Sequence, residues 1–395
     1  MGISLVNPWK EITRLNPDTE VWWDSSPLVW PNFKEDFLKG RPEAERGWYA
    51  HELDSLFGPA PASGWLFKGC TTNPPLSWAV LRTRKEEWAK VIREKRATFK
   101  GKSKYGLYLQ VYFEVVRRGA EALLPLFESS GGALGHISAQ VDMQQMRNEA
   151  AMKEMAEELA ALSPNVMVKI PGSTQGMPVF RHLASKGIAT NATCVFTMSQ
   201  IMTVAKMVAE GRALHLKDSS RPRPGWRAVC THMVGRLEDA KAFRGTIDKD
   251  NLDINAWELR SASEYVVKTC ARLFRERNLP IKMLVCSARA HRRGTKTYYP
   301  HVEMFMGGNL VYTVPPAVFG DVLTHYRDRE LKAGWDGVVP PALLEKLSQV
   351  PYFRLASTEN GYDVEQFNEI PSLLENEADF VGATREMIEY VGSFL

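Results

Sequence analysis

The chain has few cysteines and little excess charge for its 395 residues. Its five cysteines are Cys70, Cys194, Cys230, Cys270 and Cys286. Because they are odd in number and lie mostly in apolar runs, they predict buried free thiols rather than a disulfide framework. The formal net charge is only +4, and no run of Lys and Arg resembles a nucleic-acid-binding arm. We therefore expect a reducing compartment, the cytoplasm, and no nucleic-acid partner.

The sequence also lacks signatures of zinc, dinucleotide and membrane binding. No Cys/His spacing typical of zinc occurs, and no G-x-G-x-x-G turn follows the first apolar run. No apolar run approaches the length that spans a bilayer. The N-terminal "MGISLVNPWKEITR" has neither the basic start nor the long apolar core of a signal peptide. We expect no bound metal and no contact with a membrane.

Short apolar runs alternate with longer helical patterns along the chain. The apolar runs are residues 20–24, 65–71, 136–142, 166–171, 189–196, 227–233, 282–288 and 310–316. Helical patterns occupy residues 86–99, 106–130, 146–162, 176–187, 197–211 and 261–278, and Gly187 stands where a left-handed C-terminal cap is expected. Eight strands alternating with helices predict an α/β protein with a (β/α)8 TIM barrel. A doubly wound open sheet is the alternative.

We expect a single barrel domain over residues 1–395, ending in a helical segment. Two stretches, near 31–64 and 290–301, lengthen connections that follow strands. Since catalytic groups of such barrels lie at the C-terminal ends of strands, both insertions are expected on the catalytic face. The second contains the basic and aromatic "HRRGTKTYYPH". This composition suits either a cover over an anionic or bulky substrate or a solvated loop.

Lys169 is an unusual residue because it stands in an apolar strand, "VMVKIP". Lysine is seldom fully buried unless it is paired or used in chemistry. Burial disfavours the ammonium form, and a neutral amine can attack a carbonyl to form a Schiff base. The alternative is a lysine whose stem packs on apolar neighbours while its charge reaches water.

Six segments resemble the transaldolase family, in the family's order. They are "GCTTNPPL" (69–76), "HISAQVD" (136–142), the stretch from "VMVKIPGSTQG" to "ATNATCVF" (166–196), "MVGRLED" (233–239), "CSARA" (286–290) and "VYTVPPAVF" (311–319). With Asp24, the resemblance covers most of the chain. It implies a Schiff-base enzyme on a (β/α)8 barrel that needs no metal and no organic cofactor, because the lysine itself serves as the electron sink.

The resemblance also implies catalytic roles. Lys169 would be the nucleophile, and Asp24 the carboxylate that removes a proton from the hydroxyl beside the breaking bond. Thr193 would position a catalytic water. Gln140 stands where most transaldolases carry a glutamate that shuttles protons through a water. The alternative for Asp24 is a turn residue, since Ser, Ser and Pro follow it.

Substrate contacts follow in the same way. The residues implied to bind the sugar, the lysine intermediate or a phosphate are Asn73, Asn191, Thr231, Arg236, Ser287 and Arg289. Guanidinium groups bind phosphate in bidentate fashion, so the two arginines suit a phosphate grip. The alternatives are satisfied polar groups of the barrel core for the asparagines and ordinary ion pairs for the arginines.

Gln140 is the main departure from the family pattern. Related Schiff-base fructose-phosphate aldolases resemble the chain in having glutamine there, and they use a tyrosine on the sixth strand instead. This chain has Met233 at that place, which leaves Asp142 and His232 as candidate substitutes.

The expected function is transfer of a three-carbon dihydroxyacetone unit between sugar phosphates. One alternative is a Schiff-base aldolase that cleaves or forms a ketose or ketose phosphate, including a specialised metabolite. Another is a catalytically silent barrel that binds sugar phosphate. The expected partner is a small sugar phosphate or ketose, and both a monomer and a homodimer are compatible with the sequence.

Overall fold

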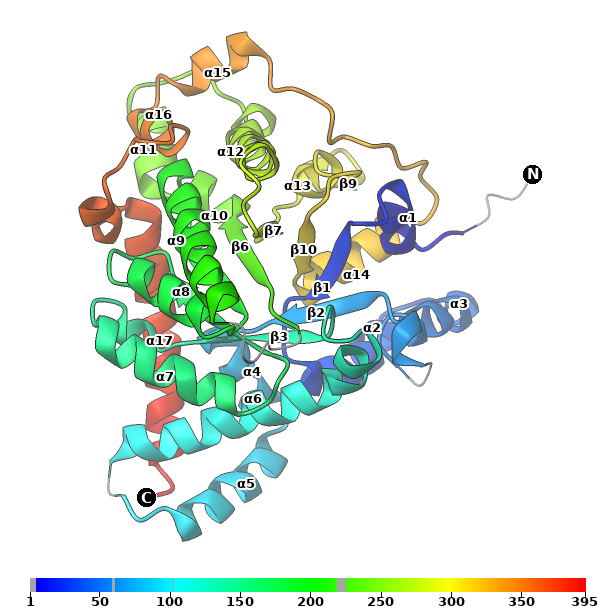
Figure 1. Cartoon of the computed structure of the whole chain (residues 1–395). Coiled ribbons are helices and arrows are strands. Elements are labelled where there is room, and N and C mark those ends of the chain that lie inside the picture. Colours follow the sequence, from blue (N-terminus) through cyan, green and yellow to red (C-terminus); the bar gives the residue numbers. More distant parts are fainter. Residues whose placement is uncertain (1–4, 59–60, 102, 219–224) are drawn as a thin grey trace.

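The computed structural model describes residues 5–58, 61–101, 103–218 and 225–395. Its centre is a closed barrel of eight parallel strands, in the order β1-β10-β7-β6-β5-β4-β3-β2 (Figure 1). The strands are β1 Glu20–Trp23, β2 Phe67–Thr71, β3 His136–Gln140, β4 Val166–Pro171, β5 Thr190–Val195, β6 Ala228–Met233, β7 Lys282–Cys286 and β10 Val311–Val314. Each coincides with one of the eight apolar runs. The (β/α)8 barrel is therefore confirmed.

Helices surround the barrel and connect successive strands. Those between β1 and β7 are α2 Trp30–Lys39, α3 Glu43–Asp54, α4 Pro74–Thr83, α5 Lys85–Thr98, α6 Lys104–Ser129, α7 Glu149–Ala161, α8 Gly176–Ser185, α9 Met198–Lys217, α10 Val234–Asp239, α11 Lys241–Lys249 and α12 Ala256–Glu276. Outside that range lie α1 Pro8–Leu15, α13 Pro300–Glu303, α14 Pro316–His325, α15 Pro341–Leu347, α16 Pro351–Ala356 and α17 Pro371–Gly392. Short 3-10 turns are η1 Pro27–Val29, η2 Ala62–Gly64, η3 Met143–Gln145 and η4 Val364–Glu369.

Two glycines illustrate how local sequence relates to helix ends. Gly187 follows α8 with a φ of 68°, as expected of a left-handed cap. The pattern also predicts that the next helix ends at Gly211, but α9 continues to Lys217. A Cβ on Gly211 would lie 2.2 Å from the carbonyl oxygen of Arg181. Gly211 therefore permits α8 and α9 to pack closely rather than ending a helix.

The 31–64 stretch, expected on the catalytic face because it follows a strand, belongs to the connection between β1 and β2. It forms most of α2, all of α3 and η2. Phe33 of α2 packs against Phe319 of α14, with ring centroids 6.1 Å apart. Phe37 lies against Gly320, where a Cβ would come within 2.8 Å of its ring. These aromatic contacts hold α2 in the helical layer beside the barrel.

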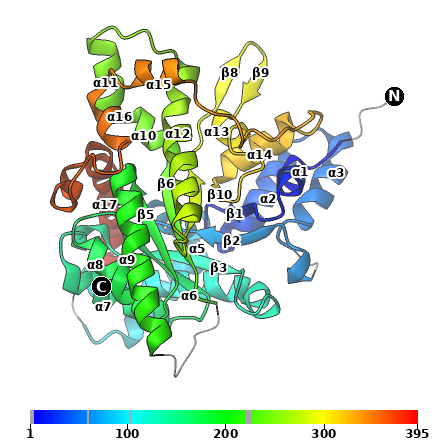
Figure 2. The ribbon, with the colours of Figure 1, turned by 45° about the horizontal axis from the view of Figure 1, so that its top comes forward.

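The remaining extra segments follow β7 and β10. Residues 290–301 contain an antiparallel hairpin of β8 His291–Arg293 and β9 Lys296–Tyr298, which Figure 2 shows projecting beside α13. The C-terminal part is helical, as expected, and ends in α17. No helix within the described ranges is long and apolar enough to cross a membrane.

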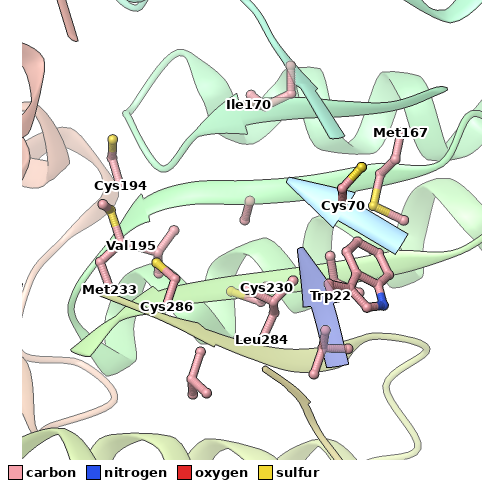
Figure 3. Packing of buried hydrophobic residues seen from close by; sticks show 14 of the residues in the cluster. Trp22, Cys70, Met167, Ile170, Cys194, Val195, Cys230, Met233, Leu284 and Cys286 are labelled. Atoms are coloured by element: carbon pink, nitrogen blue, oxygen red, sulfur yellow. The ribbon is translucent and has the colours of Figure 1, made fainter. Parts of the chain in front are cut away.

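Apolar side chains fill one end of the barrel interior, and polar side chains line the other end. Trp22, Met167 and Leu284 are fully buried (Figure 3). A Cβ on Gly69 would lie 2.8 Å from the Trp22 ring, so only glycine leaves room for this indole. The five cysteines are buried and unbonded, as the sequence predicts. The packed residues lie toward the N-terminal ends of the strands, and the functional candidates lie at the opposite ends.

Candidate active site

Lys169 lies inside the barrel between two polar neighbours. In the sheet register its Cα is opposite Gln140 of β3 on one side and Asn191 of β5 on the other. Partners in register share a face of the sheet, so the three side chains line the same wall. Lys169 is 5% exposed. Its Nζ donates to the carbonyl oxygen of Thr72 at 3.1 Å.

Asp24 follows β1 and faces the same space. Its carboxylate accepts a hydrogen bond from Thr71 Oγ1 at 2.6 Å, and that hydroxyl is also paired with the hydroxyl of Thr313. Burial raises the pKa of Asp24, and the opposing effects of the Lys169 charge and the Thr71 hydrogen bond are smaller. The backbone N–H of Asp24 donates to Val314 at 3.0 Å. The backbone of Asp24 is therefore tied to β10 directly after β1 ends.

Gln140 and Thr193 bring polar atoms into the interior that the protein does not satisfy. Gln140 is 1% exposed, and Thr193 is fully buried. Neither Nε2 nor Oε1 of Gln140, nor Oγ1 of Thr193, has a hydrogen-bond partner within the described part of the chain. Buried polar groups are usually paired because leaving them unpaired costs about 1–3 kcal/mol each. Such atoms are suited to contact a bound molecule.

Thr193 lies at an irregularity in β5. The register of β5 against β6 shifts between Ala192 and Val195, and Cys194 takes a φ of 53°. Gln200 holds this bulge, since its Nε2 donates to Cys194 at 3.2 Å and to Gly172 at 2.7 Å. Bulges of this kind redirect side chains next to functional sites. Burial raises the pKa of the Cys194 thiol to about 12, so this thiol stays protonated.

Asn191 and Thr231 form a hydrogen-bonded chain across three strands. The Asn191 amide donates to Ser138 Oγ at 2.9 Å, and its Oδ1 accepts from Thr231 Oγ1 at 2.6 Å. All three side chains are buried. Thr231 thus lies in the barrel interior beside Asn191, while the two arginines expected to share its role lie farther out.

Arg289 and Ser287 lie at the rim, after β7. Arg289 Nε donates to Asp239 Oδ2 at 2.7 Å, and Nη1 donates to the carbonyl of Ser287 at 2.9 Å. Ser287 takes a φ of 64°. A Cβ on Gly235 would lie 2.3 Å from the Ser287 carbonyl oxygen, so α10 packs directly onto this turn. Burial raises the pKa of Asp239, but the pairing with Arg289 outweighs it and the net pKa is lowered.

Arg236 and Asn73 complete the rim. Arg236 of α10 pairs with Asp379 of α17, with Nη1 and Oδ2 2.6 Å apart. Asn73 is half-buried and caps α4, because its Oδ1 accepts from the backbone N–H of Leu76 at 2.9 Å. No group of three His, Cys, Asp or Glu side chains in the described residues could hold a metal ion.

Comparison with known proteins identifies the family. Residues 62–368 match the sequence model of the family described as Transaldolase/Fructose-6-phosphate aldolase, which is more than half of the chain. The chain belongs to this family. Asp24 and α17 lie outside the matched residues, on either side of them.

Individual relatives are similar over shorter stretches. A transaldolase of Thiobacillus denitrificans is 26% identical over 174 residues, which are 44% of this chain and 47% of that protein. A transaldolase of Kocuria rhizophila is 27% identical over 43% of this chain and 46% of its own length. A probable transaldolase of Chlorobium phaeovibrioides is 34% identical over 30% of this chain and 45% of its own length. The matched stretches thus span less than half of these relatives.

The two candidate substitutes for the family's glutamate are both engaged elsewhere. His232 alternates with Thr231 and therefore lies on the outer face of β6, where its Nε2 is 3.3 Å from Ser263 Oγ of α12. Burial lowers its pKa to about 3. Asp142 accepts hydrogen bonds from Tyr105 Oη and the backbone N–H of Gln144, each at 2.9 Å. His232 therefore faces away from Lys169, and Asp142 is hydrogen-bonded to Tyr105 and Gln144.

Three hydroxyls inside the barrel are not among the site residues predicted from the sequence. They belong to Thr71, Ser138 and Thr313. Alternation along a strand contains the signal that finds Ser138, since it lies two residues before Gln140 and therefore on the same face. The other two stand inside the family segments "GCTTNPPL" and "VYTVPPAVF".

Proposed function

We propose that this transaldolase-family enzyme transfers a three-carbon dihydroxyacetone unit between sugar phosphates through a Schiff base on Lys169. The observation that supports this most strongly is a buried amine surrounded by unused hydrogen-bonding groups. Lys169 is 5% exposed with a carbonyl partner 3.1 Å away, and Gln140 and Thr193 present unpaired polar atoms nearby. A ketose would give these atoms partners.

The proposed reaction balances with the residues present. The Lys169 amine attacks the ketose carbonyl, and water leaves to give an iminium. Asp24 takes the proton of the hydroxyl beside the breaking carbon–carbon bond, so that an aldehyde leaves and the electron pair moves into the iminium. A second aldehyde then accepts the three-carbon unit by the reverse steps. A raised pKa makes the Asp24 carboxylate a stronger base than a free carboxylate.

A second candidate is an aldolase that releases the three-carbon ketone. Gln140 favours it, because an amide can orient a water but cannot take its proton. In that reaction the enamine gains a proton, and water then hydrolyses the iminium to free Lys169. Transfer and release share the first half of the reaction and differ only in what consumes the enamine.

Borohydride trapping tests the shared half. The enzyme is incubated with fructose 6-phosphate, reduced with borohydride and digested, and the adduct is located by mass spectrometry. We expect a stable adduct on the peptide that contains Lys169. Lys169→Met is the matched control because it keeps the length and apolar stem of the side chain, and it should give no adduct.

The outcomes separate the candidates. An adduct whose three-carbon unit passes to an added aldehyde supports transfer, and free dihydroxyacetone without transfer supports the aldolase. If no ketose or ketose phosphate gives an adduct on correctly folded enzyme, the Schiff-base proposal is wrong and a silent sugar-phosphate-binding barrel remains.

A further inference from the structure

The C-terminal helix α17 lies at the catalytic end of the barrel (red in Figure 1). It packs against α4 and η3, which directly follow β2 and β3, and against α11 and β5. Elements that follow strands in sequence begin at the C-terminal ends of those strands. Helix α17 therefore borders the rim on which Arg236 lies.

Helix α17 is strongly acidic. Its carboxylates are Glu375, Glu377, Asp379, Glu386 and Glu389, against the single cation Arg385. Three of them reach groups near the rim. Glu375 accepts the backbone N–H of Lys241 at 3.0 Å, Glu377 pairs with Arg147, and Asp379 pairs with Arg236. Asp379 thus pairs with one of the two arginines expected to hold a phosphate, Arg236.

We propose that Asp379 is a specificity-determining residue that competes with an anionic substrate group for Arg236. The inference rests on the proposed function, since it concerns the end of the ketose that is remote from Lys169. Asp379 then weakens the binding of a phosphorylated ketose more than that of an unphosphorylated one. The helix that carries it lies beyond the residues matched to the family.

Both arginines expected to hold a phosphate are already paired with carboxylates. Arg236 is neutralised by Asp379, and Arg289 by Asp239, whose other oxygen is 3.1 Å from Arg244. A phosphate dianion that binds either arginine must therefore displace a carboxylate or approach it closely. The Arg236–Asp379 pair is the easier one to displace, because its side chains are 36% and 51% exposed.

The position of Arg236 links this pair to the interior. Arg236 belongs to α10, which directly follows β6, and β6 pairs with β5, the strand that carries Thr193. We expect a substrate that extends from Lys169 past Thr193 to end near Arg236. Exposed ion pairs are weak, so the expected effect of Asp379 is modest.

Asp379→Asn tests the proposal, with Glu377→Gln as the matched control. Both changes remove one carboxylate from the same helix, but Glu377 pairs with Arg147 instead of Arg236. For Asp379→Asn we expect KM for fructose 6-phosphate to fall about threefold to fivefold, while KM for fructose is unchanged. The difference should shrink at high salt. Glu377→Gln should change neither KM.

Calorimetric titration with inorganic phosphate gives a second readout that needs no turnover. Asp379→Asn should bind phosphate about threefold to fivefold more tightly than the native enzyme. An equal KM change for both sugars, or unchanged phosphate affinity, would overturn the role of Asp379. Failure of the Schiff-base proposal would be visible separately, as the absence of a Lys169 adduct in both enzymes.

Discussion

A carboxylate lies at each end of strand β1, and the pKa values of the two are shifted in opposite directions. Glu20 begins the strand and pairs with Arg227 and with Lys282. Burial raises the pKa of Glu20, but the two cations outweigh it and hold the pKa at about 2. Asp24 comes directly after the strand, has a hydroxyl as its hydrogen-bond donor, and has a raised pKa.

The indole of Trp22 lies on the strand between them. Its Nε1 donates to Glu20 at 2.9 Å, and the Arg227 guanidinium lies 5.3 Å from its ring. The N-terminal end of the barrel is therefore closed by paired charges and an aromatic ring. The C-terminal end keeps a carboxyl, an amine and two unpaired polar groups. The first arrangement favours stability and the second favours chemistry, the division expected of such barrels.

The largest expected effect comes from Asp24→Asn. The amide keeps the shape of the carboxylate but cannot remove a proton, so turnover should fall about 10²- to 10⁴-fold. The Lys169 adduct should still form in borohydride trapping. Steady-state kinetics and mass spectrometry measure the two separately.

Folding stability provides the control for Asp24→Asn. A carboxyl whose pKa is raised in the folded state costs stability once it ionises, so the variant should be as stable as the native enzyme or more so. Nearly native turnover would show that Asp24 is not the base.

Glu20→Gln should give the converse result. It leaves Arg227 and Lys282 without their shared carboxylate, which we expect to lower the free energy of unfolding by about 3 kcal/mol. The kcat of the folded fraction should be unchanged. Urea unfolding measures the loss, and Glu149→Gln, which breaks an exposed pair with Lys153, should cost less than about 0.5 kcal/mol.

The loss of folding stability at low pH also distinguishes Glu20 from Asp24. Glu20 has a pKa of about 2 in the folded state against 4.5 as the reference value. Its stabilisation is therefore complete above pH 4.5 and is lost as the pH falls from there toward 2. Glu20→Gln should show a shallower loss of stability over this interval. If Glu20→Gln and the native protein lost the same stability over this interval, Glu20 would not be stabilised by its cations.

A smaller effect than that of Asp24→Asn is expected of Gln140→Glu. A carboxylate beside Lys169 can accept the proton of a water that the amide can only orient, so the rate of transfer should rise by up to about tenfold. Gln140→Met, which removes both polar atoms, should lower it. The ratio of transfer to release, measured with and without an aldehyde acceptor, is the readout. An unchanged rate in Gln140→Glu would refute the idea that the missing carboxylate limits the enzyme.

Much of the barrel could be predicted from local sequence. Parallel strands buried on both faces appear as continuous apolar runs, and all eight do. Lys169 and Asn191 are both placed on strands by the sequence, and the structure adds that they lie opposite each other. The role expected of Asp24, like those of the other candidate site residues, follows from the resemblance to the family.

The ion pairing of Arg236 at the rim could not be predicted from local sequence. Arg236 and Asp379 are 143 residues apart in sequence, and their pairing depends on where α17 packs. The bulge at Cys194 was also hidden, because residues 189–196 look like an unbroken strand. Both features arise from contacts between distant elements, which no local pattern encodes.

The closure of the barrel has a consequence for synthesis of the chain on the ribosome. Strand β1 pairs with β2 and with β10, and β10 is translated after the other seven strands. Until then the growing sheet has two open edges, one of them next to the aromatic pair Trp22 and Trp23. Such edges invite association with other nascent chains. Folding of this protein should therefore depend on chaperones until β10 emerges, and Asp24 reaches its backbone partner Val314 only at that moment.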